Sequence, residues 1–364
     1  MTDNFINQME PEFDDHEAKA LYEYVRSGGW VTEFKKTEEF EKIIAQFVGA
    51  KHCIAVNNGT ISLTLSALAC GIGVNDEVIV PNYTMVATPN SVKMIGAKPV
   101  FVDVEEETLC LDLDLVRQNL TSKTKAIMFV NANGRYPLNN IENIIQFCKK
   151  EKLKLIEDSA QALGSFYPSG SHMGTIGDVG SFSFSAPKII STGQGGAIVT
   201  NDDTIASKIK KLKDFGRSGG GNDIHDTIGY NFKFTDVQAV IGIEQFKKLD
   251  NRIIRKKEIA QGYHELLKNT DNIKMFKHDL NYTTPWFIDG LFEQREKLID
   301  FLKANNIGTR VMYPSISHQE AYKLGGDFPV SKKVADKGLW LPSSSSLTND
   351  QVEFICNKIN SFYA

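Results

Sequence analysis

Short apolar runs alternate with amphipathic stretches along the chain from about residue 50 to residue 201. Apolar runs of about four to eight residues between turn residues are typical of buried strands, and the longer stretches between them have helical spacing. Strands that are apolar on both faces and separated by helices indicate a mostly parallel sheet between helical layers. Seven runs are expected to be strands: Cys53–Thr60, Glu77–Pro81, Pro99–Val104, Ala126–Ala132, Leu153–Ala160, Gly180–Ser185 and Gly196–Asn201.

The pattern changes after about residue 245. Residues 244–267 predict one long helix that leads out of the first domain, and residues 295–316 and 350–364 predict a smaller α+β unit. We therefore expect an α/β fold with a large domain over residues 1–245 and a small C-terminal domain over residues 246–364. The first fifty residues are expected to pack against the small domain.

Polar residues lie at the carboxyl ends of the predicted strands, where sheets of this class bind their ligands. They are Asn57, Asn58, Asp103, Asn131, Asp158 and Ser183. The run from Asn57 to Thr60 ends a strand and opens a helix, so its free amides suit a phosphate, although it also fits an ordinary turn and N-cap. Asp158 follows an apolar run, where a carboxylate needs a cationic partner; the alternative is an N-cap for the next helix.

Lys188 follows Pro187 at the junction of two strands, among small residues. Burial there would lower the pKa of the amine and suit it to attack a carbonyl, whereas the alternative is a surface lysine in a hairpin. Gly193, Gly195 and Gly196 disfavour the hairpin because they let the backbone approach something bulky. A phosphate cradle, a buried carboxylate and an activated lysine together meet the needs of pyridoxal phosphate, which binds lysine as a Schiff base.

Composition and charge exclude several other classes of function. The formal net charge of −4 gives no general attraction to nucleic acid or to anionic membranes, and no apolar run is long enough to span a bilayer. The basic runs 208–213 and 252–257 are interpreted as solvated helix faces. The five cysteines are odd in number and lie in apolar contexts, which favours buried free thiols, no metal site and a reducing, cytoplasmic location.

The motifs "NNGT", "IEDSAQALGS", "GSFSFSAPKIISTGQGGAIVTND", "GYNFKFTDVQAVIGIEQ" and "GTRVMYPSISHQEAY" follow one another along the chain. In this order they resemble the DegT/DnrJ/EryC1/StrS sugar aminotransferases, and the resemblance covers nearly the whole chain. It implies a fold-type I pyridoxal-phosphate enzyme that moves an amino group, with glutamate as the donor, to a keto sugar. The acceptor would be a nucleotide-linked 4-keto-6-deoxy sugar for surface polysaccharide, and the enzyme would be a homodimer with shared active sites.

The resemblance also implies roles for individual residues. Lys188 would carry the cofactor and move the proton, Asp158 would pair with the pyridine nitrogen, and Gln161 would lie near the phenolic oxygen. The phosphate would be held by four residues, of which the last would reach across the dimer interface: Gly59, Thr60, Ser183 and Asn231. The substrate side would be lined by Arg310, Tyr313 and His318.

Two positions depart from the family pattern. Relatives have an aromatic residue on the cofactor ring where this chain has Met85; a thioether can also pack on a ring face. Tyr83 would point to the opposite side of an extended stretch and is a poor substitute. Arg135 lies where many relatives have a histidine-containing loop; it would either bind an anionic group at the substrate mouth or be an exposed loop arginine.

Three alternatives to a sugar aminotransferase follow from the same residues. A small phosphorylated ketone could be the acceptor, with Arg135 or Arg310 binding its phosphate. A related branch dehydrates sugars and has histidine in place of the lysine, so Lys188 argues against it. A regulatory or binding protein without catalysis is disfavoured because Lys188, Asp158 and Ser183 are all present.

Overall fold

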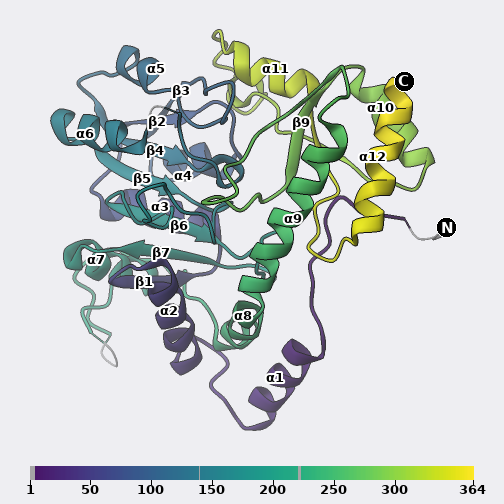
Figure 1. The fold of residues 1–364 in the computed structure, drawn as a ribbon. Coiled ribbons are helices and arrows are strands. Elements are labelled where there is room, and N and C mark those ends of the chain that lie inside the picture. Colours follow the sequence, from purple (N-terminus) through teal and green to yellow (C-terminus); the bar gives the residue numbers. More distant parts are fainter. Residues whose placement is uncertain (1–4, 139, 220–222) are drawn as a thin grey trace.

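The computed structural model describes residues 5–138, 140–219 and 223–364, so the first four residues of the predicted large domain lie outside it. Its main element is a seven-stranded sheet with strand order β1-β7-β6-β5-β4-β2-β3 (Figure 1). Each of the seven predicted runs forms one strand: β1 (His52–Val56), β2 (Glu77–Pro81), β3 (Lys98–Val102), β4 (Thr124–Val130), β5 (Lys154–Asp158), β6 (Val179–Ser183) and β7 (Gly196–Thr200). Only β7 runs against its neighbours β1 and β6, which confirms the mostly parallel sheet.

Helices cover both faces of this sheet. Alternate residues of each strand point to opposite sides, and both sets are apolar, so each face needs a helical layer to bury it. In β4, Ala126 and Met128 pack in one core with α3 and α4, whereas Ile127 and Phe129 pack in another core with α6. One layer consists of α3 (Gly59–Ala69), α4 (Ala87–Met94) and α7 (Asp203–Lys213). The other includes α2 (Lys35–Val48), α5 (Leu113–Gln118), α6 (Ile141–Glu151) and α8 (Asp236–Lys247).

The first turn of α3 lies directly against β6 and β7. A Cβ atom added at Gly196 would lie 2.6 Å from the carbonyl oxygen of Asn58, and one added at Gly59 would lie 2.9 Å from Cβ of Ser183. Only glycine allows such an approach. At Gly196 the bulky neighbour that the sequence predicted is therefore the chain's own backbone, and the contact sets the start of α3 beside the end of β6.

A second, antiparallel sheet has the order β10-β11-β9-β8. Its strands are β8 (Ile273–Met275), β9 (Ile288–Phe292), β10 (Arg310–Val311) and β11 (Gly338–Leu341). Helices α9 (Leu249–Leu267), α10 (Arg295–Ala304) and α12 (Asn349–Tyr363) share one buried core with it. The remaining helices are α1 (Asp15–Arg26), α11 (Pro329–Lys337) and the short 3₁₀ turns Ala132–Gly134 and Ile316–His318. The division into domains 1–245 and 246–364 stays a prediction.

Two expectations about chain packing were wrong. The helix predicted over residues 244–267 is broken between α8 and α9 at Lys248, whose ammonium turns back to Asp14 and Glu17 at 2.8 and 2.7 Å. The first fifty residues do not all pack on the second sheet. Ile6 does, pairing with Ile307, but the apolar stripe of α2 packs on the large sheet beside Phe184, because the face over β1 and β7 offers it apolar contacts.

Among the described residues, no helix is both long enough and apolar enough to cross a membrane.

Candidate active site

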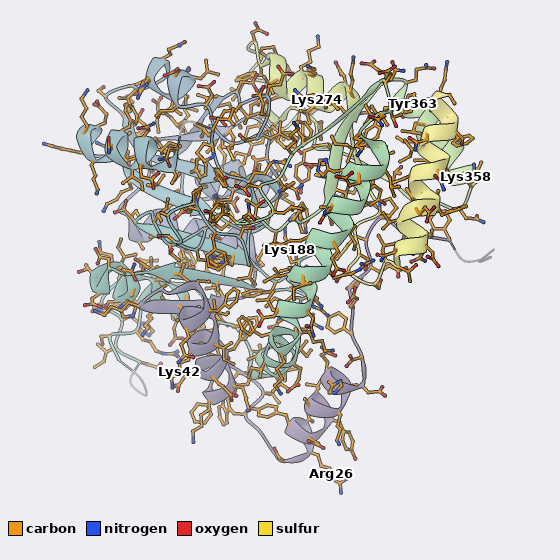
Figure 2. The ribbon with its side chains drawn as sticks, in the orientation of Figure 1. Arg26, Lys42, Lys188, Lys274, Lys358 and Tyr363 are labelled. Carbon is orange, nitrogen blue, oxygen red and sulfur yellow. The ribbon has the colours of Figure 1, made fainter. Side chains whose placement is uncertain are left out.

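A cleft of about 500 Å³ opens over the carboxyl ends of β4, β5 and β6. It is formed where the first turn of α3 and the loop after β2 meet these strand ends. Figure 2 shows Lys188 in the middle of the molecule, beside α9. Seven of the residues that the sequence assigned to the cofactor line this one cleft: Gly59, Thr60, Met85, Asp158, Gln161, Ser183 and Lys188.

The amine of Lys188 faces this cleft without a counter-ion. Within the described part of the chain it has no hydrogen-bond or ion-pair partner, and its Nζ lies 3.9 Å from the centre of the Trp286 ring. Burial lowers its pKa to about 8, an effect that Asp158 opposes and Arg310 reinforces. Only the unprotonated amine is a nucleophile, and a pKa of about 8 leaves roughly a tenth of Lys188 in that form at neutral pH, far more than an ordinary lysine.

Trp286 is a site residue that the sequence analysis missed. Its ring stacks on the Lys188 ammonium, a favourable cation–π arrangement, and its indole N–H donates to the carbonyl of Pro187 at 2.7 Å. The tryptophan thus holds both the amine and the peptide before it. It lies about a hundred positions further along the chain, and its only signal was a large aromatic residue in the apolar run before β9.

Asp158 is the last residue of β5 and is almost completely buried. Thr88, a residue of α4 not singled out from the sequence, donates to its Oδ2 at 2.7 Å, and the Ala160 amide approaches Oδ1 at 3.3 Å. Burial raises the pKa of Asp158, while Thr88, Ala160 and Lys188 act in the opposite direction. The residues after it form turns and no helix, so the N-cap alternative is wrong. A buried carboxyl group with so few donors fits a protonated ring nitrogen.

The start of α3 offers unused donors beside a hydroxyl group. The Asn58 side chain caps the helix by accepting from the Ile61 amide at 2.9 Å, so the N-cap interpretation is correct as well. The amides of Gly59 and Thr60 donate to no group in the described ranges, and Ser183 lies next to Gly59. Two free amides at the positive end of an eleven-residue helix, with a serine hydroxyl, fit a phosphate.

The other two cofactor residues complete the lining of the cleft. Gln161 accepts a 2.6 Å hydrogen bond from the Asn133 amide through Oε1, which leaves its amide nitrogen available as a donor. Met85 is exposed and lines the cleft, whereas Tyr83 is buried, packs against Tyr313 and lies outside the lining. The thioether is therefore the side chain at this position that can cover a bound ring.

The expectations for Arg135 were wrong. Arg135 is 3% exposed and forms a bidentate pair with Asp289 at 2.9 and 2.8 Å. Its Nε donates to the carbonyl of Thr108 at 2.8 Å, and Nη1 also contacts His278. A guanidinium whose donors are used inside the protein can neither bind substrate at the mouth of the cleft nor act as an exposed loop arginine.

The remaining predicted residues do not line the cleft. Arg310 and Tyr313 flank Trp340. Burial raises the pKa of Tyr313; the nearby Arg310 guanidinium opposes this rise, and Asp158 adds to it. His318 hydrogen-bonds Ser315 and lines a separate groove of about 550 Å³, so the structure does not bring it to Lys188. Asn231 is exposed and also lies outside the cleft.

Comparison with known proteins gives this cleft its context. Residues 11–360 match the DegT/DnrJ/EryC1/StrS aminotransferase family. The chain belongs to this family. It is 36% identical to a GDP-perosamine synthase of Escherichia coli O157:H7 over 99% of both chains. It is 34% identical to dTDP-3-amino-3,6-dideoxy-alpha-D-galactopyranose transaminase of Aneurinibacillus thermoaerophilus over 93% of both.

The fold comparison agrees with the sequence comparison. An aminotransferase of Helicobacter pylori involved in pseudoaminic acid biosynthesis superposes with a TM-score of 0.91 at 25% identity over 99% of each chain. The protein described here is therefore a transaminase that uses pyridoxal phosphate. Its free amine, buried carboxyl group and open helix start fit that cofactor.

The lowered pKa of Lys188 can be tested in the cofactor-free protein. Only the free base of an amine reacts, so a lowered pKa moves reactivity to lower pH, and labelling of Lys188 should reach half its maximal rate at a pH of about 8. Acetylation over a pH series, resolved by peptide mass spectrometry, gives this midpoint, with the exposed Lys42 as internal reference. Equal midpoints for the two lysines would contradict the assignment of a buried amine.

Proposed function

We propose that the protein transfers an amino group from glutamate to a nucleotide-linked 4-keto-6-deoxy sugar, with Lys188 as the catalytic residue. The observation that carries the proposal is the Lys188 amine, which faces the cleft near Asp158 without a counter-ion. The names of the two relatives support a nucleotide-linked sugar as the acceptor, since one makes a GDP-linked amino sugar and the other a dTDP-linked one. They differ in the nucleotide, and the dTDP-linked product carries its amino group on carbon 3, so the base and the position of the keto group are left to experiment.

The lining of the cleft supports one orientation of the cofactor. Asp158 would pair with the ring nitrogen, Gln161 would donate to the phenolic oxygen, and Met85 would cover one face of the ring. The phosphate would bind Gly59, Thr60 and Ser183. When bound, pyridoxal phosphate supplies an aldehyde that lysine can engage and a ring that withdraws electrons from the reacting carbon.

The chain's own residues supply the proton transfer. Lys188 Nζ would take the proton from the carbon that bears the amino group of the donor, and would return a proton to the former carbonyl carbon of the acceptor. The Trp286 ring would stabilise the ammonium form of Lys188 each time Nζ holds a proton. Thr88 fixes the orientation of Asp158 through its 2.7 Å hydrogen bond. The product of the donor must leave before the acceptor can enter the same cleft, so ping-pong kinetics are expected.

A small phosphorylated ketone is the weaker acceptor. That alternative needed Arg135 or Arg310 for the phosphate, and Arg135 is committed to Asp289. Arg310, exposed beside Trp340, is the one of the two whose guanidinium is not buried. The similarity to nucleotide-sugar enzymes over almost the whole chain favours the larger substrate.

We also propose a homodimer with shared active sites, in which Asn231 reaches the phosphate of the partner subunit. In its own chain Asn231 is exposed, and large apolar side chains nearby are exposed as well, among them Ile224, Ile228 and Tyr230. Several exposed apolar residues in one segment are typical of a protein interface. A product used for surface polysaccharide and a cytoplasmic location remain parts of the proposal; the free thiols of all five cysteines support the latter.

The role of Lys188 is tested by Lys188→Ala. Turnover should fall by roughly a thousandfold or more, because the alanine can neither engage the aldehyde nor move a proton. Pyridoxal phosphate should still bind non-covalently, seen as an absorbance spectrum of the free aldehyde. Lys42→Ala, which removes an exposed lysine of α2, is the control and should behave like the wild type. Full activity of Lys188→Ala would exclude the mechanism.

The substrate class is tested by a screen of keto acceptors. GDP- and dTDP-linked 4-keto-6-deoxy sugars and short keto phosphates are each offered to the amine-loaded enzyme, and the return of the aldehyde absorbance is followed. We expect a nucleotide-linked sugar to give the highest kcat/KM of the acceptors. We also expect glutamate to be the best donor in the first half of the reaction, in which the enzyme is loaded with the amino group. Preference for a keto phosphate would replace the proposed acceptor and leave the transaminase assignment intact.

The shared site is tested by Asn231→Ala. If Asn231 binds the partner subunit's phosphate, its loss should weaken affinity for pyridoxal phosphate by roughly tenfold, the effect of one hydrogen bond to a charged group. Asn281→Ala, an exposed asparagine of another loop, is the control. Sedimentation should show a dimer for all three proteins. A monomer with unchanged cofactor affinity would overturn this part of the proposal.

A further inference from the structure

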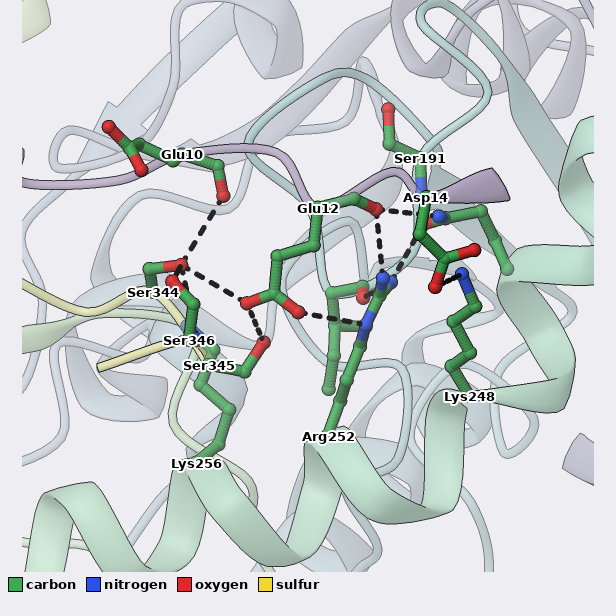
Figure 3. A network of polar contacts seen from close by, with 12 residues as sticks. Glu10, Glu12, Asp14, Ser191, Lys248, Arg252, Lys256, Ser344, Ser345 and Ser346 are labelled. Atoms are coloured by element: carbon green, nitrogen blue, oxygen red, sulfur yellow. Dashed lines mark hydrogen bonds and ion pairs between the residues drawn. The ribbon is translucent and has the colours of Figure 1, made fainter. Parts of the chain in front are cut away.

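Two cations on α9 are buried, contrary to the solvated face that the sequence predicted for residues 252–257. Arg252 is 7% exposed and Lys256 is 2% exposed. They are four residues apart, so they lie on the same side of the helix, one turn from each other. In Figure 3 both side chains extend from α9 toward the N-terminal segment and the serine-rich loop at residues 344–346.

Among the described residues, Lys256 binds two carbonyl groups and no carboxylate. Its Nζ donates to the carbonyl of Trp286 at 2.7 Å and to the carbonyl of Ser343 in a short hydrogen bond. Burial lowers its pKa to about 7, and Glu12 opposes that effect. A buried ammonium without an ion pair is destabilising, so packing alone would favour an apolar residue here.

Arg252 binds the chain on the other side of the candidate nucleophile. Its Nη1 donates to the carbonyl of Ile189 at 2.9 Å and to Oε1 of Gln245 at 2.7 Å. Its Nη2 donates to the carbonyl of Glu12 at 3.0 Å. Ile189 directly follows Lys188, so the guanidinium fixes the peptide unit between Ile189 and Ile190, one residue beyond the nucleophile.

The two carbonyls belong to the two segments that enclose the Lys188 amine. Ile189 continues the backbone that carries the side chain, and Trp286 contributes the ring 3.9 Å from Nζ. The indole N–H of Trp286 also binds the carbonyl of Pro187. Because both cations project from one rigid helix, α9 sets the position of the ring relative to the backbone of Lys188.

We propose that Arg252 and Lys256 are positioning residues for Lys188, which hold the Ile189 and Trp286 carbonyls so that the amine faces the cleft in the geometry needed for attack. This inference rests on the proposed function of Lys188 as the point of cofactor attachment. In that step Nζ attacks the aldehyde carbon, a C=N bond forms, and the aldehyde oxygen leaves as water. A positioning role affects this bond and leaves recognition of the ring and phosphate unchanged.

The test compares two ligands in cofactor-free Lys256→Met, a variant of similar length without the charge. Pyridoxal phosphate can form the covalent bond; pyridoxine phosphate has the same ring and phosphate but an alcohol in place of the aldehyde. The rate of covalent linkage, followed by absorbance and located by borohydride reduction and peptide mapping, should fall by about tenfold. The Kd of pyridoxine phosphate should stay within about twofold of the wild-type value.

The control is Lys257→Met, which removes the half-buried neighbouring lysine of the same helix and should change neither readout. Arg252→Lys is a second variant that keeps the charge but lacks the planar fork with which Arg252 reaches oxygens of three separate segments at once. It should slow linkage and spare pyridoxine phosphate, and it decides the question if Lys256→Met does not fold.

Each other outcome has a definite meaning. Equal loss for both ligands would show a general structural role, and unchanged linkage in the variants would show that the amine needs no such support; either result overturns the inference. If reduction of the wild-type protein does not label Lys188, the proposed function fails, and the inference fails with it for that separate reason.

Discussion

The site depends on an amine that is partly shielded from water and has no counter-ion among the described residues. Shifting the pKa of Lys188 from 10.5 to about 8 corresponds to roughly 3 kcal/mol of stability. The folded-state pKa is lowered, so this cost is present in full below pH 8 and disappears as the pH rises toward 10.5. The surrounding structure must therefore hold Lys188 against the tendency of its ammonium to reach solvent. Trp286 and the backbone on both sides of Lys188 supply that restraint.

Two adjacent carboxyl groups at the end of β5 differ in the number of hydrogen-bond donors that they receive. Glu157 accepts hydrogen bonds from the amides of Gly174, Ile176 and Gly177, and one from Tyr167. Asp158, on the opposite face of the strand, receives one good hydrogen bond, from Thr88. Both groups are buried, but only Asp158 is left short of donors. Glu157 thus secures the loop below the strand, while Asp158 remains available for a cationic ligand.

The sequence predicted the large sheet and most of the cleft because local rules govern both. Buried strands appear in the sequence as apolar runs, and the carboxyl ends of parallel strands lie together. The sequence alone therefore predicts that Asp158 and Ser183 lie near each other. The prediction from sequence was wrong where a long side chain binds a partner far away in the chain. Arg135 pairs with Asp289, and Lys256 turns inward from a run of charges. Helical spacing identifies neighbours along one helix and says nothing about partners from another sheet.

The distant partners show why the site lies at the junction of the two sheets. The phosphate cradle and Asp158 come from the large sheet and the helix beside it, whereas Trp286 precedes a strand of the small one. α9 joins them, and Glu12 of the N-terminal segment accepts from Arg252 across the same junction (Figure 3). Any shift of one sheet against the other would move the ring relative to the amine and change the hydration that sets its pKa. The reactivity of Lys188 is therefore a property of how the whole chain is joined, which a fragment containing only the large sheet would lack.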